Sequence, residues 1–113
     1  MRQHSRHWQV LLLLFAAAGV VYLMRHGTAA ESVDVRYFGR VDLSSYDCLH
    51  VTRSSFIRRV CFNRVQRRMV ISLNGICYAY CAIPESTVST LTAAGSMGQF
   101  YNSQIKGRYA CNR

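Results

Sequence analysis

The sequence predicts a small α+β domain. An antiparallel β-meander of about three strands is covered by two C-terminal helices and preceded by an N-terminal hydrophobic membrane or signal helix. Three observations support this prediction. The dipeptide Asn74-Gly75 separates two apolar segments, which is the strongest short-range signal for a two-residue hairpin. Pro84 follows the second segment and is typical of a helix start. A largely apolar run, with Trp8 and Met24 at its ends, lies close to the N-terminus.

The apolar run of residues 8–24 predicts a leader that extends over residues 1–30. As a helix with a rise of ~1.5 Å per residue, it reaches about 25 Å, close to the shortest membrane span. Two arginines precede the run, and this charge favours a cytoplasmic N-terminus. We favour an uncleaved signal anchor, and the alternative is a cleaved signal peptide. In both cases we expect export across a bacterial inner membrane. The domain is then either membrane-anchored outside the cytoplasm or periplasmic or secreted.

Residues 31–53 predict an extended N-terminal arm or linker. Val33, Val35 and Tyr37 alternate with polar residues, which indicates a short strand, and Gly39 interrupts this pattern. We expect this arm to be a linker if the leader is an anchor, and to pack on the domain otherwise.

Three strands are predicted within the domain of residues 54–113, at residues 56–62, 67–73 and 76–82, where β-branched and aromatic residues are frequent. The Asn-Gly turn sets the register of the second and third strands. It places six side chains on one face in three opposed pairs: Leu73 with Ile76, Ile71 with Tyr78, and Met69 with Tyr80. The apolar residues of the first strand do not follow one alternation, which predicts a β-bulge near Arg58 and Arg59.

Two helices are expected after the strands. Pro84 and Glu85 suit the first turn of a helix that ends at Gly95. Ser96 is expected to cap a second helix, from residue 97 to about residue 105, because serine is a preferred N-cap residue. Gly107 is expected to end it.

The order of these motifs resembles the KTSC domain, a family named after a C-terminal module of some lysyl-tRNA synthetases. The resemblance extends over residues 54–109 and is strongest to the exported, cysteine-bearing single-domain branch of the family. It rests on the following residues: Arg53-Ser54-Ser55 before Ile57 and Val60, Tyr78-Ala79-Tyr80, Ile83-Pro84 before Val88, Leu91 and Ala94, and Ser96-x-Gly98-x-Phe100-Tyr101-Asn102-x-x-Ile105-x-Gly107-x-Tyr109. It implies a small strand meander with C-terminal helices, and RNA binding is the function suggested for the family.

Five cysteines follow the leader, and an oxidising compartment favours disulfides between them. Cys77 and Cys81 would lie about 13 Å apart on one strand, and Cys61 and Cys81 about 9.6 Å apart across two strand spacings, both beyond the reach of a disulfide. Two possibilities remain. Cys48 and Cys111 each bond one of Cys61 and Cys81, which we favour, or they bond each other. The exported relatives that the chain resembles usually lack a cysteine at position 77, which implies that Cys77 is the spare one.

The sequence does not indicate a catalytic or metal site. The cysteines lack zinc-ligand spacing, and His50 is the only histidine after the leader. The five carboxylates after the leader are mostly in the arm. We therefore expect a protein that is not an enzyme, with no cofactor, no metal and no small-molecule substrate.

A binding function agrees better with the charge of the chain. After the leader, eleven Lys and Arg face five Asp and Glu, and such an excess favours anionic partners. The candidate anion-binding residues are Arg58, Arg59, Arg64, Arg67 and Arg68 around the first hairpin, with Lys106 and Arg108 in the tail. Tyr78 and Tyr80 are candidates either for base stacking or for the core under the helices, which we favour. We expect a protein partner or an anionic polymer at the cell envelope, and nucleic acid is the alternative.

Overall fold

The computed structural model describes residues 31–112. The predicted leader, with its membrane contact through residues 8–24, lies outside these residues and remains a prediction. Within the described part of the chain, no helix has the length and apolar character needed to cross a membrane.

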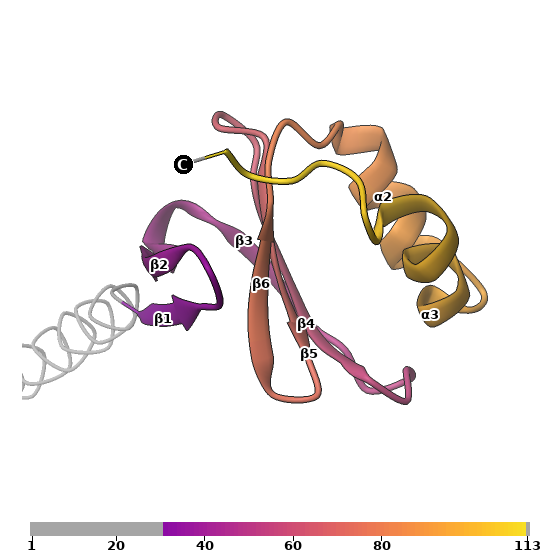
Figure 1. Cartoon of the computed structure of the whole chain (residues 1–113). Helices are drawn as coiled ribbons and strands as arrows, with labels where there is room; N and C mark the ends of the chain where they lie inside the picture. Colours follow the sequence, from indigo (N-terminus) through magenta and orange to yellow (C-terminus); the bar gives the residue numbers. More distant parts are fainter. Residues whose placement is uncertain (1–30, 113) are drawn as a thin grey trace, which may run out of the picture. The chain divides into compact units, whose positions relative to one another are not determined.

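The described residues form one six-stranded sheet and a C-terminal helical segment (Figure 1). The strands are β1 (Ser32–Val35), β2 (Gly39–Asp42), β3 (Asp47–His50), β4 (Ile57–Asn63), β5 (Arg68–Leu73) and β6 (Ile76–Tyr80), in the spatial order β2-β1-β6-β5-β4-β3. The prediction of about three strands was therefore wrong in number. The three additional strands come from the arm, where each has four residues. β1 and β2 form a hairpin with each other, and β1 and β3 also pair with β6 and β4 of the domain.

The central hairpin, β5 and β6, has the predicted register. Leu73 pairs with Ile76, and the two further predicted pairs are also present. Asn74 and Gly75 both have positive φ, 53° and 85°, which confirms the predicted type I′ turn. The register of β4 against β5 shifts between Ile57 and Arg59, which confirms the predicted bulge.

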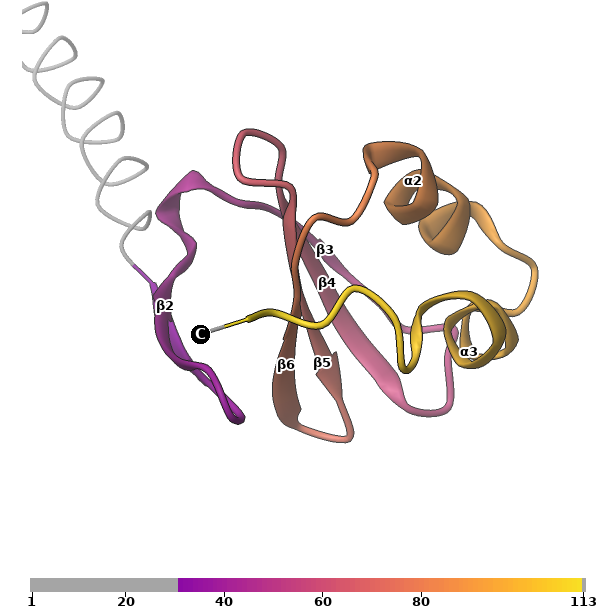
Figure 2. The same ribbon diagram turned by 45° about the horizontal axis from the view of Figure 1, so that its top comes forward.

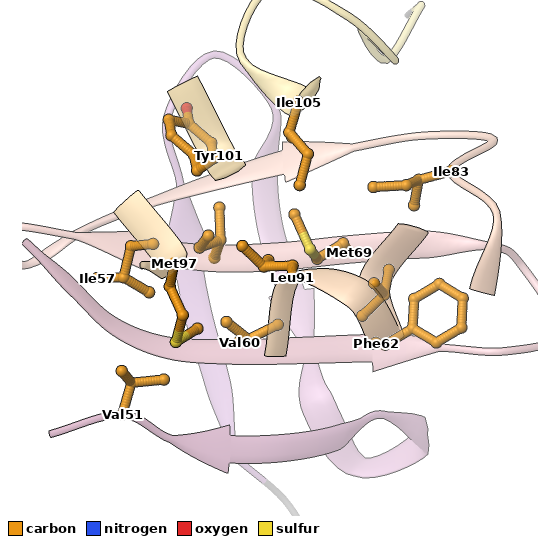
Figure 3. Close-up of a cluster of buried hydrophobic side chains, with 12 residues drawn as sticks. Val51, Ile57, Val60, Phe62, Met69, Ile83, Leu91, Met97, Tyr101 and Ile105 are labelled. Carbon is orange, nitrogen blue, oxygen red and sulfur yellow. The ribbon is translucent and has the colours of Figure 1, made fainter. Parts of the chain in front are cut away.

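One face of the sheet packs under the helices and forms the first core (Figure 3). Met69, Ile71, Leu91 and Ile105 are almost completely buried there. Two aromatic residues of β6, Tyr78 and Tyr80, are partly buried and pack against the same core, as favoured from the sequence.

The opposite face is covered by the arm, which packs on the domain instead of serving as a linker. Val35, Val41, Leu43 and Tyr46 are buried against Cys61 and Val70 of the central strands in a second core. Leu43 lies in a short 3-10 helix, η1 (Leu43–Ser45). The sheet therefore curls, and Figures 1 and 2 show β2 on the side of the sheet away from α2 and α3.

The C-terminal segment contains α2 (Glu85–Ala93), α3 (Met97–Phe100) and a π-helical continuation, η2 (Tyr101–Ile105). Pro84 is the N-cap residue of α2 and thus precedes the first turn by one position. The Ser96 side chain accepts a hydrogen bond from the main-chain N–H of Gln99, as expected for the predicted cap.

Two disulfides attach the ends of the domain to the sheet. Cys48 of β3 bonds Cys61 directly opposite on β4, and Cys111 of the tail bonds Cys81 at the end of β6. This confirms the favoured pairing of the arm and the tail with the sheet. Cys77 belongs to neither disulfide.

Candidate functional site

The arginines predicted around the first hairpin do not form one cluster. Arg58 and Arg59 lie at the start of β4, whereas Arg64, Arg67 and Arg68 lie beyond its other end or at the start of β5. Four residues, at about 3.3 Å each, separate Arg59 from the last residue of β4, a distance of about 13 Å. The prediction placed the two groups together because it did not take the length of β4 into account.

Arg58 and Arg64 make polar contacts within the domain, and Arg68 Nη1 donates to Gln66 Oε1 at 3.2 Å. Arg64 Nε lies 2.9 Å from Glu85 Oε2, and its Nη1 lies 3.9 Å from Asp47 Oδ2. Arg58 Nη1 donates to the main-chain oxygen of Ser54 at 2.9 Å. Because the ion pairs of Arg64 are exposed, they contribute little stability, but they neutralise its charge locally.

The sequence motifs shared with the KTSC domain line a polar cleft of about 380 Å³ between the loop before β4 and α3. Most of them have a structural role there. Arg53 donates to the main-chain oxygens of Thr92 and Ala94 at the end of α2, at 2.7 and 2.8 Å. At Gly98, a Cβ atom would lie 2.7 Å from the ring of Phe56, so a larger residue does not fit without rearrangement. This cleft therefore reflects the packing of the loop against the helices.

A second cleft lies where the turn between β1 and β2, the strand β6 and the C-terminal tail meet. We call it the edge cleft and define it by residues 36–38, 78–80, 107, 108, 110 and 111, which enclose about 280 Å³. Figure 2 shows the tail crossing β6 towards β2. Two connections hold these elements together. Arg36 N donates to Cys77 O at 2.8 Å, and Cys81 N donates to Tyr109 O at 2.7 Å.

Two guanidinium groups line the edge cleft, and a third lies beside it. Arg36 and Arg108 line it. Arg68 lies over the ring of Phe38, with its Cζ atom 4.8 Å from the ring centre, a cation–π distance. Arg68 and Arg108 were among the predicted residues. Arg36 was missed because the arm was interpreted as an extended segment without a binding role.

Tyr37 lies at the tip of the β1–β2 turn, beside Arg36. Its side chain is 83% exposed, and its φ is 63°, a left-handed conformation that is rare for a bulky residue. The Cζ atom of Arg36 is 5.7 Å from its ring centre. Residues in a strained backbone conformation cluster at functional sites. The briefly alternating pattern around Tyr37 indicated only a strand, so the turn was missed.

The remaining predicted residues lie away from this arrangement or at its margin. Arg67 is exposed at the hairpin end with a φ of 55°, and its main-chain oxygen accepts from Ile83 N. Lys106 is exposed directly after η2. Arg59 is half-buried on β4.

Tyr80 lines the edge cleft but also forms part of the first core. Its hydroxyl group lies 2.5 Å from that of Tyr101. Burial, and then the hydrogen bond with Tyr101, raise the pKa of Tyr80 well above its usual value of 10.0. The phenol therefore stays protonated, and it connects β6 to the last helix.

Metal-binding groups do not gather in the part of the chain that the structure describes: no three His, Cys, Asp or Glu side chains come together there. The only histidine in this part, His50, is exposed on β3.

Comparisons with known proteins agree with this architecture. Residues 53–109 match the KTSC domain family. The crystal structure of a KTSC domain protein from Yersinia pestis superimposes with a TM-score of 0.54 and 26% sequence identity, covering 60% of this chain and 96% of the other. No curated protein matches the chain significantly. Strands β1 to β3 precede the matched residues, so the edge cleft combines the matched part with an N-terminal addition. The chain belongs to the KTSC domain family, and residues 53–109 are its KTSC domain.

Proposed function

We propose that this protein is an exported, non-catalytic binding module whose partner is an anionic macromolecule of the cell envelope. The observation that carries the proposal is the pair Arg36 and Arg108 in the lining of the edge cleft, beside the exposed ring of Tyr37. Arg68 lies next to this lining, over the ring of Phe38. Guanidinium groups bind carboxylate, phosphate and sulfate through paired donors, and their field attracts anionic partners.

The two disulfides support an extracytoplasmic location, because such bonds form and persist in oxidising compartments. Together with the apolar run of residues 8–24, they support an exported domain, which is either held outside the cytoplasm by a signal anchor or cleaved to a periplasmic or secreted form.

A binding role also agrees with the state of the reactive side chains. Cys48, Cys61, Cys81 and Cys111 are oxidised, so none of them offers a thiolate nucleophile. The Tyr80 hydroxyl holds its proton. His50 pairs in register with Arg59, away from the edge cleft.

Heparin chromatography of the full-length chain in a non-ionic detergent tests the proposal. We expect the natural chain to be retained at low salt. Arg36→Gln/Arg108→Gln should elute at a clearly lower salt concentration, because each lost contact with an anionic group lowers the affinity and its dependence on salt. The matched control, Arg58→Gln/Arg64→Gln, removes the same number of charges from positions outside the cleft. Equal decreases for both variants, or no retention of the natural chain, would contradict the proposed site.

Nucleic acid is the alternative anionic partner. Tyr78 and Tyr80 pack against the first core, which leaves less of their rings for base stacking than the sequence alone implied. Retention on single-stranded DNA at higher salt than on heparin would favour nucleic acid over an envelope polymer or protein.

A further inference from the structure

The side of β6 that faces away from β5 has one residue whose main-chain N–H and C=O are not paired with another strand. In the β5–β6 hairpin, the residues that flank the two-residue turn exchange hydrogen bonds, and this arrangement alternates along the strands. The main-chain groups of Tyr78 and Tyr80 therefore point towards β5. Those of Cys77, Ala79 and Cys81 point away from β5, towards the edge.

The bonds observed on that edge agree with this alternation. Cys77 O accepts from Arg36 N, and Cys81 N donates to Tyr109 O. Ala79 lies between them, and its outward N–H and C=O form no hydrogen bond to any residue in the described range 31–112. The edge cleft lies at this position, because residues 78–80 line it between the β1–β2 turn and the tail.

We infer that the edge cleft binds an extended, acidic segment of a partner protein by strand addition at Ala79. This inference rests on the proposed function and names the partner class. A neighbouring N–H and C=O on a strand edge are complementary to another polypeptide main chain, which specifies a protein segment rather than a polysaccharide. Arg36 of the β1–β2 turn and Arg108 of the tail both line the cleft and supply the complement to an acidic side chain.

The cleft limits the length of the added strand. Cys77 and Cys81 are already engaged, and they are about 13 Å apart at ~3.3 Å per residue. The bound segment thus pairs over about three residues, and only one of them exchanges main-chain hydrogen bonds with Ala79. The exposed ring of Tyr37 at the rim offers an apolar contact to a neighbouring side chain of the segment.

Peptide binding to the full-length chain in non-ionic detergent tests this inference. The probe is the acetylated and amidated peptide Thr-Val-Glu-Val-Thr, followed by NMR. We expect the Ala79 amide to shift and its hydrogen exchange to slow on binding. N-methylation of the central peptide residue should weaken binding by about tenfold, because it removes one main-chain donor and crowds the edge. Replacement of Glu by Lys in the peptide should weaken binding further, since it opposes Arg36 and Arg108.

Two protein variants form a matched pair. Ala79→Pro removes the outward N–H, and proline is tolerated on a strand where this group faces away from the sheet. Ala79→Val keeps the N–H. We expect an approximately tenfold loss of peptide affinity for Ala79→Pro and no such loss for Ala79→Val. If Ala79→Pro does not fold, the N-methylated peptide still decides the question.

Equal binding of the N-methylated and parent peptides would overturn strand addition, and so would heparin retention without any peptide binding. Both outcomes leave the proposed anion-binding function intact. If the natural chain is not retained on heparin, the proposed function itself is overturned.

Discussion

Arg53 and Ala94 connect the loop before β4 to the end of α2: Arg53 Nη1 donates to the main-chain oxygen of Ala94 at 2.8 Å. A second nitrogen of the same guanidinium group donates to Thr92 O at 2.7 Å. The last carbonyl groups of a helix lack partners within the helix and carry partial negative charge, so a cation is favourable there. The side chain of a residue outside the helix thus completes its C-terminus.

Replacement of Arg53 by lysine should lower the free energy of unfolding by about 1 kcal/mol, because an ammonium group cannot span both carbonyls as the planar guanidinium group does. Urea unfolding followed by circular dichroism measures the change. Arg67→Lys serves as the control, because Arg67 is exposed and its side chain forms no hydrogen bond within residues 31–112. A comparable loss for both variants would show that the contact with α2 has no particular importance.

Gly98→Ala should destabilise the domain by about 1–3 kcal/mol, because the added Cβ meets the Phe56 ring at 2.7 Å and forces it to move. Phe56→Leu in the same chain should restore part of the loss. Gly95→Ala is the control, since no atom lies within 4 Å of the added Cβ there. The free energies of unfolding of the natural chain and these three variants decide whether the close approach of Phe56 requires a glycine at position 98.

Tyr80→Phe should lower stability at pH 7 by about 1 kcal/mol, because the Tyr101 hydroxyl loses its partner. The folded-state pKa of Tyr80 lies above its unfolded value of 10.0, so the folded state holds the proton more tightly than the unfolded state. The stability from this group is complete below pH 10 and decreases above it. The difference between the natural chain and the variant should therefore shrink as the pH rises past 10. A constant difference between pH 8 and pH 11 would contradict the pKa shift.

The two disulfides should contribute similar stability but differ in their effect on binding. They close loops with sequence separations of 13 and 30 residues. Chain-entropy estimates for such loops are about 3 and about 3.6 kcal/mol. Cys48→Ala/Cys61→Ala and Cys81→Ala/Cys111→Ala should both lower the free energy of unfolding by amounts of this order. Only the second pair should reduce heparin retention, because Cys111 and the tail form a wall of the edge cleft. If only Cys48→Ala/Cys61→Ala reduces heparin retention, the binding surface lies near β3 instead.

The central part of the fold could be predicted because its signals are local. Asn74-Gly75 sets the register of β5 and β6, and the irregular alternation of β4 indicates its bulge. The pairing of Val35 with Cys77 has no such signal, since it joins a four-residue strand to one far along the chain. The outer strands, and with them the curl of the sheet, therefore did not follow from the sequence.

The candidate site was only partly predictable for the same reason. Charge alone identified Arg68 and Arg108, but it also selected Arg58 and Arg64, which are engaged elsewhere. Arg36 and Tyr37 depend on a turn that contains none of the usual turn dipeptides, with a tyrosine in the left-handed conformation. The grouping of side chains from the arm, β6 and the tail depends on tertiary packing.

The bond between Cys81 and Cys111 has a consequence for the maturation of the protein. In the reducing cytoplasm the newly made chain lacks this bond, and only non-covalent contacts then hold the tail beside β6. With export as proposed, the complete binding surface is assembled after translocation, when an oxidant reaches the two thiols. The timing of ligand capture would thus be controlled by thiol oxidation, and cytoplasmic anions would meet a less ordered site during synthesis.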